Sequence, residues 1–78
     1  MKKTIVSIPY LELIDWLKEA RVNRGWSIRD LAEKLEYPHT TIHRIETLER
    51  RLDVNEYVVY CRALSLDPLE GLQLFYDL

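Results

Sequence analysis

The sequence repeats one pattern five times: a residue that suits the start of a helix, followed by apolar residues spaced three and four apart. Ser and Asp side chains accept the unpaired N–H groups at a helix start, and proline suits the first turn because it has no N–H to satisfy. Apolar residues at this spacing form one face of a helix. We therefore predict helices from Ser7 to near Gly25 and over residues 27–35, 38–48, 53–64 and 67–78.

Five helices with connections of a few residues predict a compact, all-α, five-helix domain. The chain has 78 residues, of which 47% are hydrophobic and 31% are charged. A chain of this size and composition builds one hydrophobic core. We expect a single domain over residues 9–78. Residues 1–8 are a candidate N-terminal arm, because Ile5, Val6 and Ile8 suit an extended segment.

The chain has no sequence feature of a secreted or membrane protein. Cys61 is its single cysteine, so an internal disulfide cannot form. No apolar run reaches the roughly 18 residues that a membrane-spanning helix needs, and the N-terminus does not have the pattern of a signal peptide. We therefore expect a cytoplasmic protein with no membrane partner.

The second and third predicted helices fit the plan of a helix-turn-helix unit over about residues 27–48. In such a unit the second of the two helices enters the major groove of DNA. Ile42 and Ile45 lie three residues apart and must face inward. Five polar residues then face outward, Thr47 and four that lie nearer to the start of the helix: His39, Thr40, His43 and Arg44. Because Arg, Thr and His side chains can all bind base edges, we predict base contacts by these four residues.

Polar residues beside this outward face are candidates for contacts with DNA phosphates, which position a protein on the duplex. Arg29 lies on the exposed side of the second predicted helix, and Arg50 and Arg51 follow the third. Thr47 adds a hydroxyl group to the outward face. We predict phosphate contacts by these four residues.

Two less specific interpretations of the outward face stay open. His39 and His43 have the spacing of a zinc-binding pair, but neither a glutamate of the HExxH kind nor a third ligand accompanies them. The face can also be an ordinary solvated surface. The sequence has no convincing Ser–His–Asp or Cys–His arrangement and no glycine-rich phosphate loop. We therefore expect no enzyme activity, no metal and no cofactor.

Two segments resemble the phage-repressor/Cro type of helix-turn-helix regulator, the XRE family: "RVNRGWSIRDLAEKL" and "HTTIHRIETLERRLDV". The matching residues are Arg21, Gly25, Ser27, Leu31, Ala32, Leu35, Ile42, Ile45 and Glu46. The resemblance implies a five-helix fold and sequence-specific binding to double-stranded DNA. It also implies base contacts at the positions of His39, Thr40 and Arg44, and a largely buried salt bridge between Arg21 and Glu46.

The chain departs from the family pattern at three positions. Glu36 stands in the turn and Leu48 after the third helix, where the family usually has glycine. We therefore expect an altered turn geometry, and a third helix that runs on a little or ends differently. Ile28 stands where many members carry a glutamine that contacts a phosphate, and an aliphatic side chain cannot take that role.

The charge distribution agrees with DNA binding by the first two-thirds of the chain, because the remaining third is acidic. The net charge is −2, with +2 over residues 1–51 and −4 over residues 53–78. A polyanion would therefore meet the first two-thirds of the chain. We expect a small transcriptional regulator, acting as a repressor by occupying a promoter. The alternative is an antitoxin-like or adaptor module, which keeps the fold and binds another protein without relying on DNA.

The last two predicted helices carry more apolar residues than one buried face can use. A longer apolar core would account for them, and so would a homodimer, which we favour because two-fold symmetry suits a palindromic operator. The interface candidates are Val59, Tyr60, Leu72, Phe75 and Tyr76.

Overall fold

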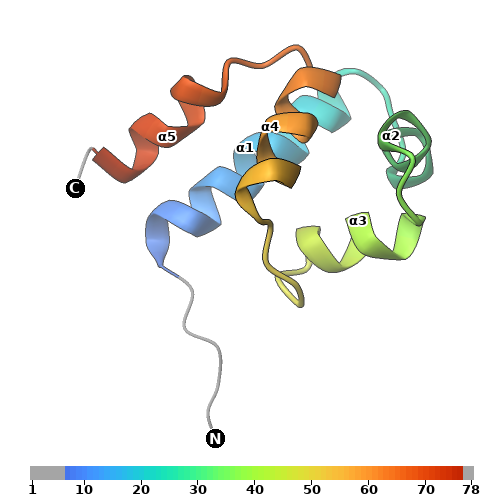
Figure 1. The fold of residues 1–78 in the computed structure, drawn as a ribbon, viewed down its shortest axis with the longest axis horizontal. Coiled ribbons are helices and arrows are strands. Elements are labelled where there is room, and N and C mark those ends of the chain that lie inside the picture. Colours follow the sequence, from blue (N-terminus) through green and yellow to red (C-terminus); the bar gives the residue numbers. More distant parts are fainter. Residues whose placement is uncertain (1–6, 77–78) are drawn as a thin grey trace, which may run out of the picture.

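The computed structural model describes residues 7–76, which form five α-helices and, within that range, no strand (Figure 1). The helices are α1 (Ile8–Asn23), α2 (Ile28–Leu35), α3 (His39–Glu46), α4 (Val54–Ala63) and α5 (Pro68–Tyr76). The predicted all-α, five-helix class is therefore confirmed. Most of the candidate arm, residues 1–6, lies outside the described residues; its last residue, Ile8, is already helical.

The capping residues start the helices as the sequence predicted, with one exception. The Ser27 hydroxyl accepts a hydrogen bond from the Asp30 backbone N–H at 3.0 Å, and the Asp30 carboxylate accepts one from the Ser27 N–H at 2.9 Å. Asp53 and Glu56 form the same reciprocal pair at the start of α4. The exception is Pro38, which we placed in the first turn of α3. Its ψ of 142° is extended, so it precedes the helix, which begins at His39.

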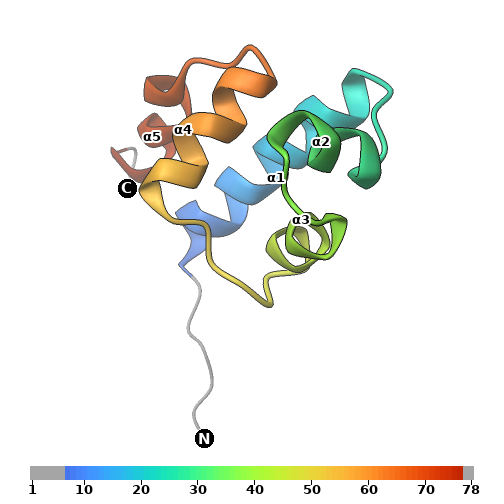
Figure 2. The same cartoon turned by 45° about the vertical axis from the view of Figure 1, so that its right-hand side comes forward.

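The core lies between α1, α4 and the pair α2 and α3. Figures 1 and 2 show α5 at one end of the molecule and α2 and α3 at the other. The buried apolar residues come from α1 to α4 and from Leu64, which directly follows α4. They are Leu13, Ile14, Leu17, Leu31, Ala32, Leu35, Ile42, Ile45, Tyr57, Tyr60, Cys61 and Leu64. Cys61 is therefore a core residue. None of the described helices is long and apolar enough to cross a membrane.

The structure corrects one interface candidate. Tyr60 is only 1% exposed, because α4 turns this side chain into the core, and it therefore cannot contact a partner subunit. Val59 and Phe75 are half-buried against the core. Leu72 and Tyr76, on the outer side of α5, are 40% and 83% exposed.

Gly71 lets α5 approach α1 closely. A Cβ atom at this position would lie 2.6 Å from the Trp16 ring and 2.9 Å from Leu13 Cδ1. Real Cβ atoms do not come so near to other heavy atoms, so only glycine fits here without a shift of the helices. The close contact fixes which side of α5 faces inward and leaves Leu69, Leu72 and Tyr76 outside.

Two of the three departures from the family pattern take up the backbone conformation that glycine favours. Glu36 has φ 60° at the end of α2, and Leu48 has φ 69° two residues after α3. The left-handed conformation ends each helix and turns the chain sharply. α3 therefore ends at Glu46 and does not run on through Leu48, so the predicted range 38–48 was too long at both ends.

We predict that Glu36→Gly raises the free energy of unfolding by about 1 kcal/mol, because glycine has no Cβ to strain the left-handed turn. The measurement is urea denaturation followed by circular dichroism. Glu33→Gly is the matched control: it removes a carboxylate from the exposed side of α2 but places glycine inside the helix, where it should cost about 1 kcal/mol. A Glu36→Gly protein less stable than the parent would contradict the strain argument.

Candidate nucleic-acid interface

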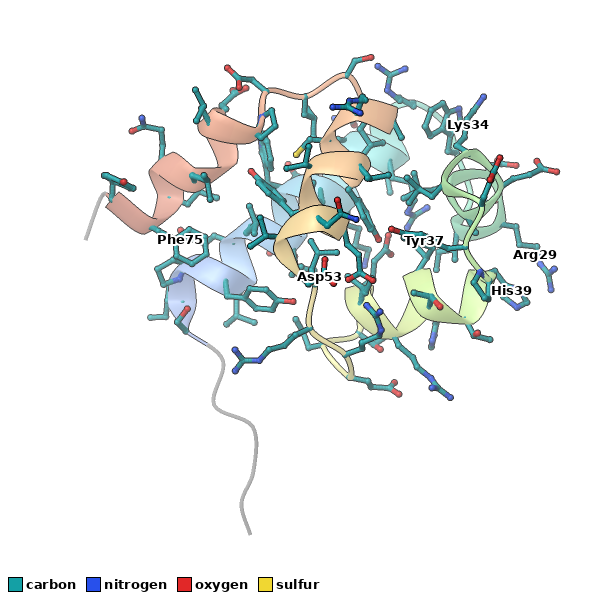
Figure 3. All side chains as sticks on the ribbon, in the orientation of Figure 1. Arg29, Lys34, Tyr37, His39, Asp53 and Phe75 are labelled. Atoms are coloured by element: carbon teal, nitrogen blue, oxygen red, sulfur yellow. The ribbon has the colours of Figure 1, made fainter. Side chains whose placement is uncertain are left out.

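A groove of about 740 Å³ lies between the start of α2 and the outer side of α3. Eight residues line it: Arg21, Ser27, Ile28, Arg29, His39, Thr40, His43 and Arg44. All four residues for which we predicted base contacts are among them, and all four are exposed. In Figure 3, Arg29 from α2 and His39 from α3 lie beside each other at this edge of the molecule.

The outward direction of α3 follows from its two isoleucines. Ile42 is fully buried and Ile45 is 1% exposed, so both anchor the inner side of the helix in the core. The pair α2 and α3 is held by the tight connection through Glu36, in which the Tyr37 N–H donates to the Ala32 carbonyl at 3.0 Å. The groove is therefore presented by two short helices that pack as one unit.

The expected salt bridge between Arg21 and Glu46 is formed. Arg21 Nε lies 2.7 Å and Nη2 3.0 Å from the two carboxylate oxygens of Glu46. Arg21 Nη1 also donates to the Trp26 carbonyl at 2.7 Å. This one guanidinium group therefore ties α1 to the last turn of α3 and to the loop that precedes α2.

The four residues with predicted phosphate contacts do not gather in one place. Arg29 alone lines the groove. The Thr47 hydroxyl donates to the Glu49 carboxylate at 2.9 Å. Arg50 forms two hydrogen bonds with Glu56, at 2.6 and 3.0 Å, and Arg51 is exposed in the loop after α3.

Arg50 and Glu56 shift each other's pKa. The hydrogen bond from Arg50 is the largest cause that holds the pKa of Glu56 below its usual value, and the same bond raises the pKa of Arg50. Because this guanidinium already faces a carboxylate, it offers less net charge to a phosphate than Arg29 does.

Sequence reasoning missed three residues of the groove: Arg21, Ser27 and Ile28. Ser27 and Ile28 stand at the start of α2, and the sequence signal was the family pattern, which has a phosphate-contacting glutamine at the position of Ile28. Arg24, at the end of α1, does not line the groove: it donates to the Leu64 carbonyl at 3.1 Å and lies 5.2 Å from the centre of the Trp26 ring.

The described residues offer no metal centre. Across residues 7–76, no group of three or more His, Cys, Asp or Glu side chains is placed to hold a metal ion. His39 and His43 therefore lack the further ligands that a protein zinc site requires.

Comparison with known proteins gives two matches and one negative result. A family model described as a helix-turn-helix domain matches residues 12–72, a range that runs from α1 into α5. Among solved structures, an XRE-family like protein from Pseudomonas syringae pv. tomato str. DC3000 is 37% identical, with a TM-score of 0.80 over 88% of this chain and 85% of that one. No curated protein sequence matches.

Proposed function

The chain belongs to the XRE-type helix-turn-helix family of DNA-binding regulators, and from this premise we propose that it reads a specific sequence of double-stranded DNA. The observation that carries the proposal is the groove, where His39, Thr40, His43 and Arg44 gather on the outer side of a helix whose inner side is fixed by the core. A helix of this kind places its first turns against base edges in the major groove.

Each groove residue has a chemical role in this proposal. Arg44 can donate two parallel hydrogen bonds to guanine, and Thr40 offers both a hydroxyl and a methyl group. His39 and His43 can each donate or accept a hydrogen bond. Arg29, at the edge of the groove, would contact a phosphate and so fix the register of α3 on the duplex.

The remaining predicted phosphate contacts, by Thr47, Arg50 and Arg51, belong to the segment that follows α3. This segment would run along the backbone of the duplex next to the groove. α5, which carries Glu70, lies at the opposite end of the molecule from α3, so this negative charge would stay away from the DNA (Figure 1). Asp53 and Glu56 stand at the start of α4, where Glu56 pairs with Arg50, so part of the acidic segment lies beside the segment that follows α3.

We further propose that the protein is a cytoplasmic repressor. A domain of this kind that occupies a promoter would block the binding of other proteins there, and it would need no further activity to do so. The alternative function is that of an antitoxin-like or adaptor module, and the apolar side chains exposed on α1, α4 and α5 favour it: Ile8, Leu11, Val54, Leu69, Leu72 and Tyr76.

Binding to duplexes selected from a randomised pool, measured by anisotropy over a range of salt concentrations, separates the two functions. DNA binding predicts that log K falls linearly with log salt, with a slope of about −0.9 for each phosphate neutralised. Arg29→Ala should reduce the steepness of that slope by about one. No binding to any selected duplex at about 50 mM salt would reject the proposal and leave the protein-interaction module.

A homodimer on a palindromic operator is part of the proposal. Leu69, Leu72 and Tyr76 expose apolar surface on one side of α5, which is costly to leave in water. A two-fold pair formed through this side, with Val59 and Phe75 at its edge, must set two α3 helices about 34 Å apart to fit both half-sites of a palindrome.

We predict that sedimentation equilibrium at micromolar concentration gives the mass of a dimer, and that Tyr76→Ser shifts the equilibrium toward the monomer because it removes apolar contact area. Val22→Ser, which changes an exposed apolar residue on α1, is the control and should leave the dimer intact. A monomer at every concentration tested would contradict the homodimer.

A further inference from the structure

Ile28 is the one aliphatic residue among the eight that line the groove. The other seven carry hydroxyl, imidazole or guanidinium groups, and all of these except the Arg21 guanidinium, which is bound to Glu46, can bind phosphates or polar base edges. Ile28 can do neither. Its partly buried side chain therefore leaves an apolar area in a groove that is otherwise suited to polar recognition.

The position of Ile28 is well fixed. It is the first residue of α2, directly after Ser27, whose reciprocal hydrogen bonds with Asp30 hold the start of the helix. Part of the side chain packs against the core, so the remainder is held at the wall of the groove. Thr40, in the first turn of α3, lines the same groove and adds a second methyl group.

The major groove of DNA offers one apolar group on its base edges, the 5-methyl group of thymine. We propose that Ile28, together with the Thr40 methyl group, forms an apolar patch that recognises this methyl group, and that Ile28 is thus a specificity-determining residue. The inference rests on the proposed function, since it assigns one base to the groove already described. It predicts a thymine at a fixed position in each half-site.

The test replaces each thymine of the selected duplex, one at a time, by deoxyuridine, which lacks the methyl group and keeps every hydrogen-bonding group. A single replacement at the recognised position should weaken binding about fourfold, the factor that corresponds to about 0.8 kcal/mol for one buried methyl-sized group. Ile28→Ala should bind the thymine duplex more weakly and should no longer distinguish thymine from uracil at that position.

Two further variants make the result specific. Ile28→Val keeps a branched apolar group and should retain part of the discrimination, which covers the case in which Ile28→Ala is poorly folded. Val22→Ala, an aliphatic change on α1 outside the groove lining, should retain all of it. With a cytosine–guanine pair at the same position, the parent should bind a duplex with 5-methyldeoxycytidine more tightly than one with deoxycytidine, and equal binding would count against recognition of the methyl group.

The possible failures are distinguishable. No binding to any duplex would reject the proposed function itself. Specific binding with no deoxyuridine effect at any position would overturn only the role of Ile28. An effect of the same size in the parent and in folded Ile28→Ala would overturn it as well.

Discussion

Arg21→Ala is expected to lower the free energy of unfolding by about 3–5 kcal/mol, the largest loss that we predict for a single substitution. The side chains of Arg21 and Glu46 are only 10% and 7% exposed. Removing the guanidinium group would leave the Glu46 carboxylate buried without its counter-charge, and the Trp26 carbonyl without its donor. Urea denaturation followed by circular dichroism measures the loss.

Three variants identify the cause of that loss. Glu46→Ala should be nearly as harmful as Arg21→Ala, because it strands the opposite charge. The double variant Arg21→Met, Glu46→Leu should be much closer to the parent, since apolar residues can replace a buried ion pair at little cost. Lys18→Ala, which removes an exposed cation from the same helix, should change stability by less than about 0.5 kcal/mol. A loss below about 1 kcal/mol for Arg21→Ala would contradict the buried-pair account.

Arg44→Ala is expected to weaken binding to the selected duplex by about 1–3 kcal/mol, or roughly 5- to 150-fold, and to relax the base preference at one position of each half-site. The exposed guanidinium group lines the groove and should pair with a guanine there. Anisotropy titrations on the selected duplex, and on its three variants at the affected base pair, measure both effects.

Arg29→Ala is the matched comparison for Arg44→Ala, because it removes the same charge from the same groove. A lost phosphate contact should weaken all duplexes about equally, whereas a lost base contact should weaken the preferred duplex most. If both substitutions weakened every duplex to the same degree, the assignment of Arg44 to a base edge would be wrong.

The local parts of the fold were predictable because their causes are local. Ser27 with Asp30, and Asp53 with Glu56, are side chains three residues apart whose hydrogen bonds close within one helical turn. Ile42 and Ile45 were enough to orient α3, because two strongly apolar residues three positions apart leave a single choice of buried face.

The non-local parts could not be obtained in the same way. The apolar residues of α4 lie on more than one side of the helix. Its sequence therefore does not show that Tyr60 is buried and Val59 only half-buried. Arg50 and Glu56 are joined across a loop whose path depends on the left-handed Leu48. The pairing of Arg21 with Glu46 spans α1 to α3, and it was expected only from the family resemblance.

The residues of the groove could be predicted only in part, because some depend on local periodicity and others on the packing of the helices. The outward residues of α3 follow from periodicity alone, but the participation of Ile28 and Arg21 depends on how α2 and α1 pack behind them. This packing brings a specificity candidate, Ile28, into a site that the sequence assigned to polar residues.

The central claim is that the outer side of α3 reads a DNA sequence, and the ratio of two affinities tests it most directly. The measurement compares binding of the selected duplex with binding of a scrambled duplex of the same composition, at physiological salt. Sequence-specific recognition predicts that the selected duplex binds at least about 1,000 times more tightly, and that Arg44→Ala reduces this ratio. Equal affinity for the two duplexes would contradict the claim.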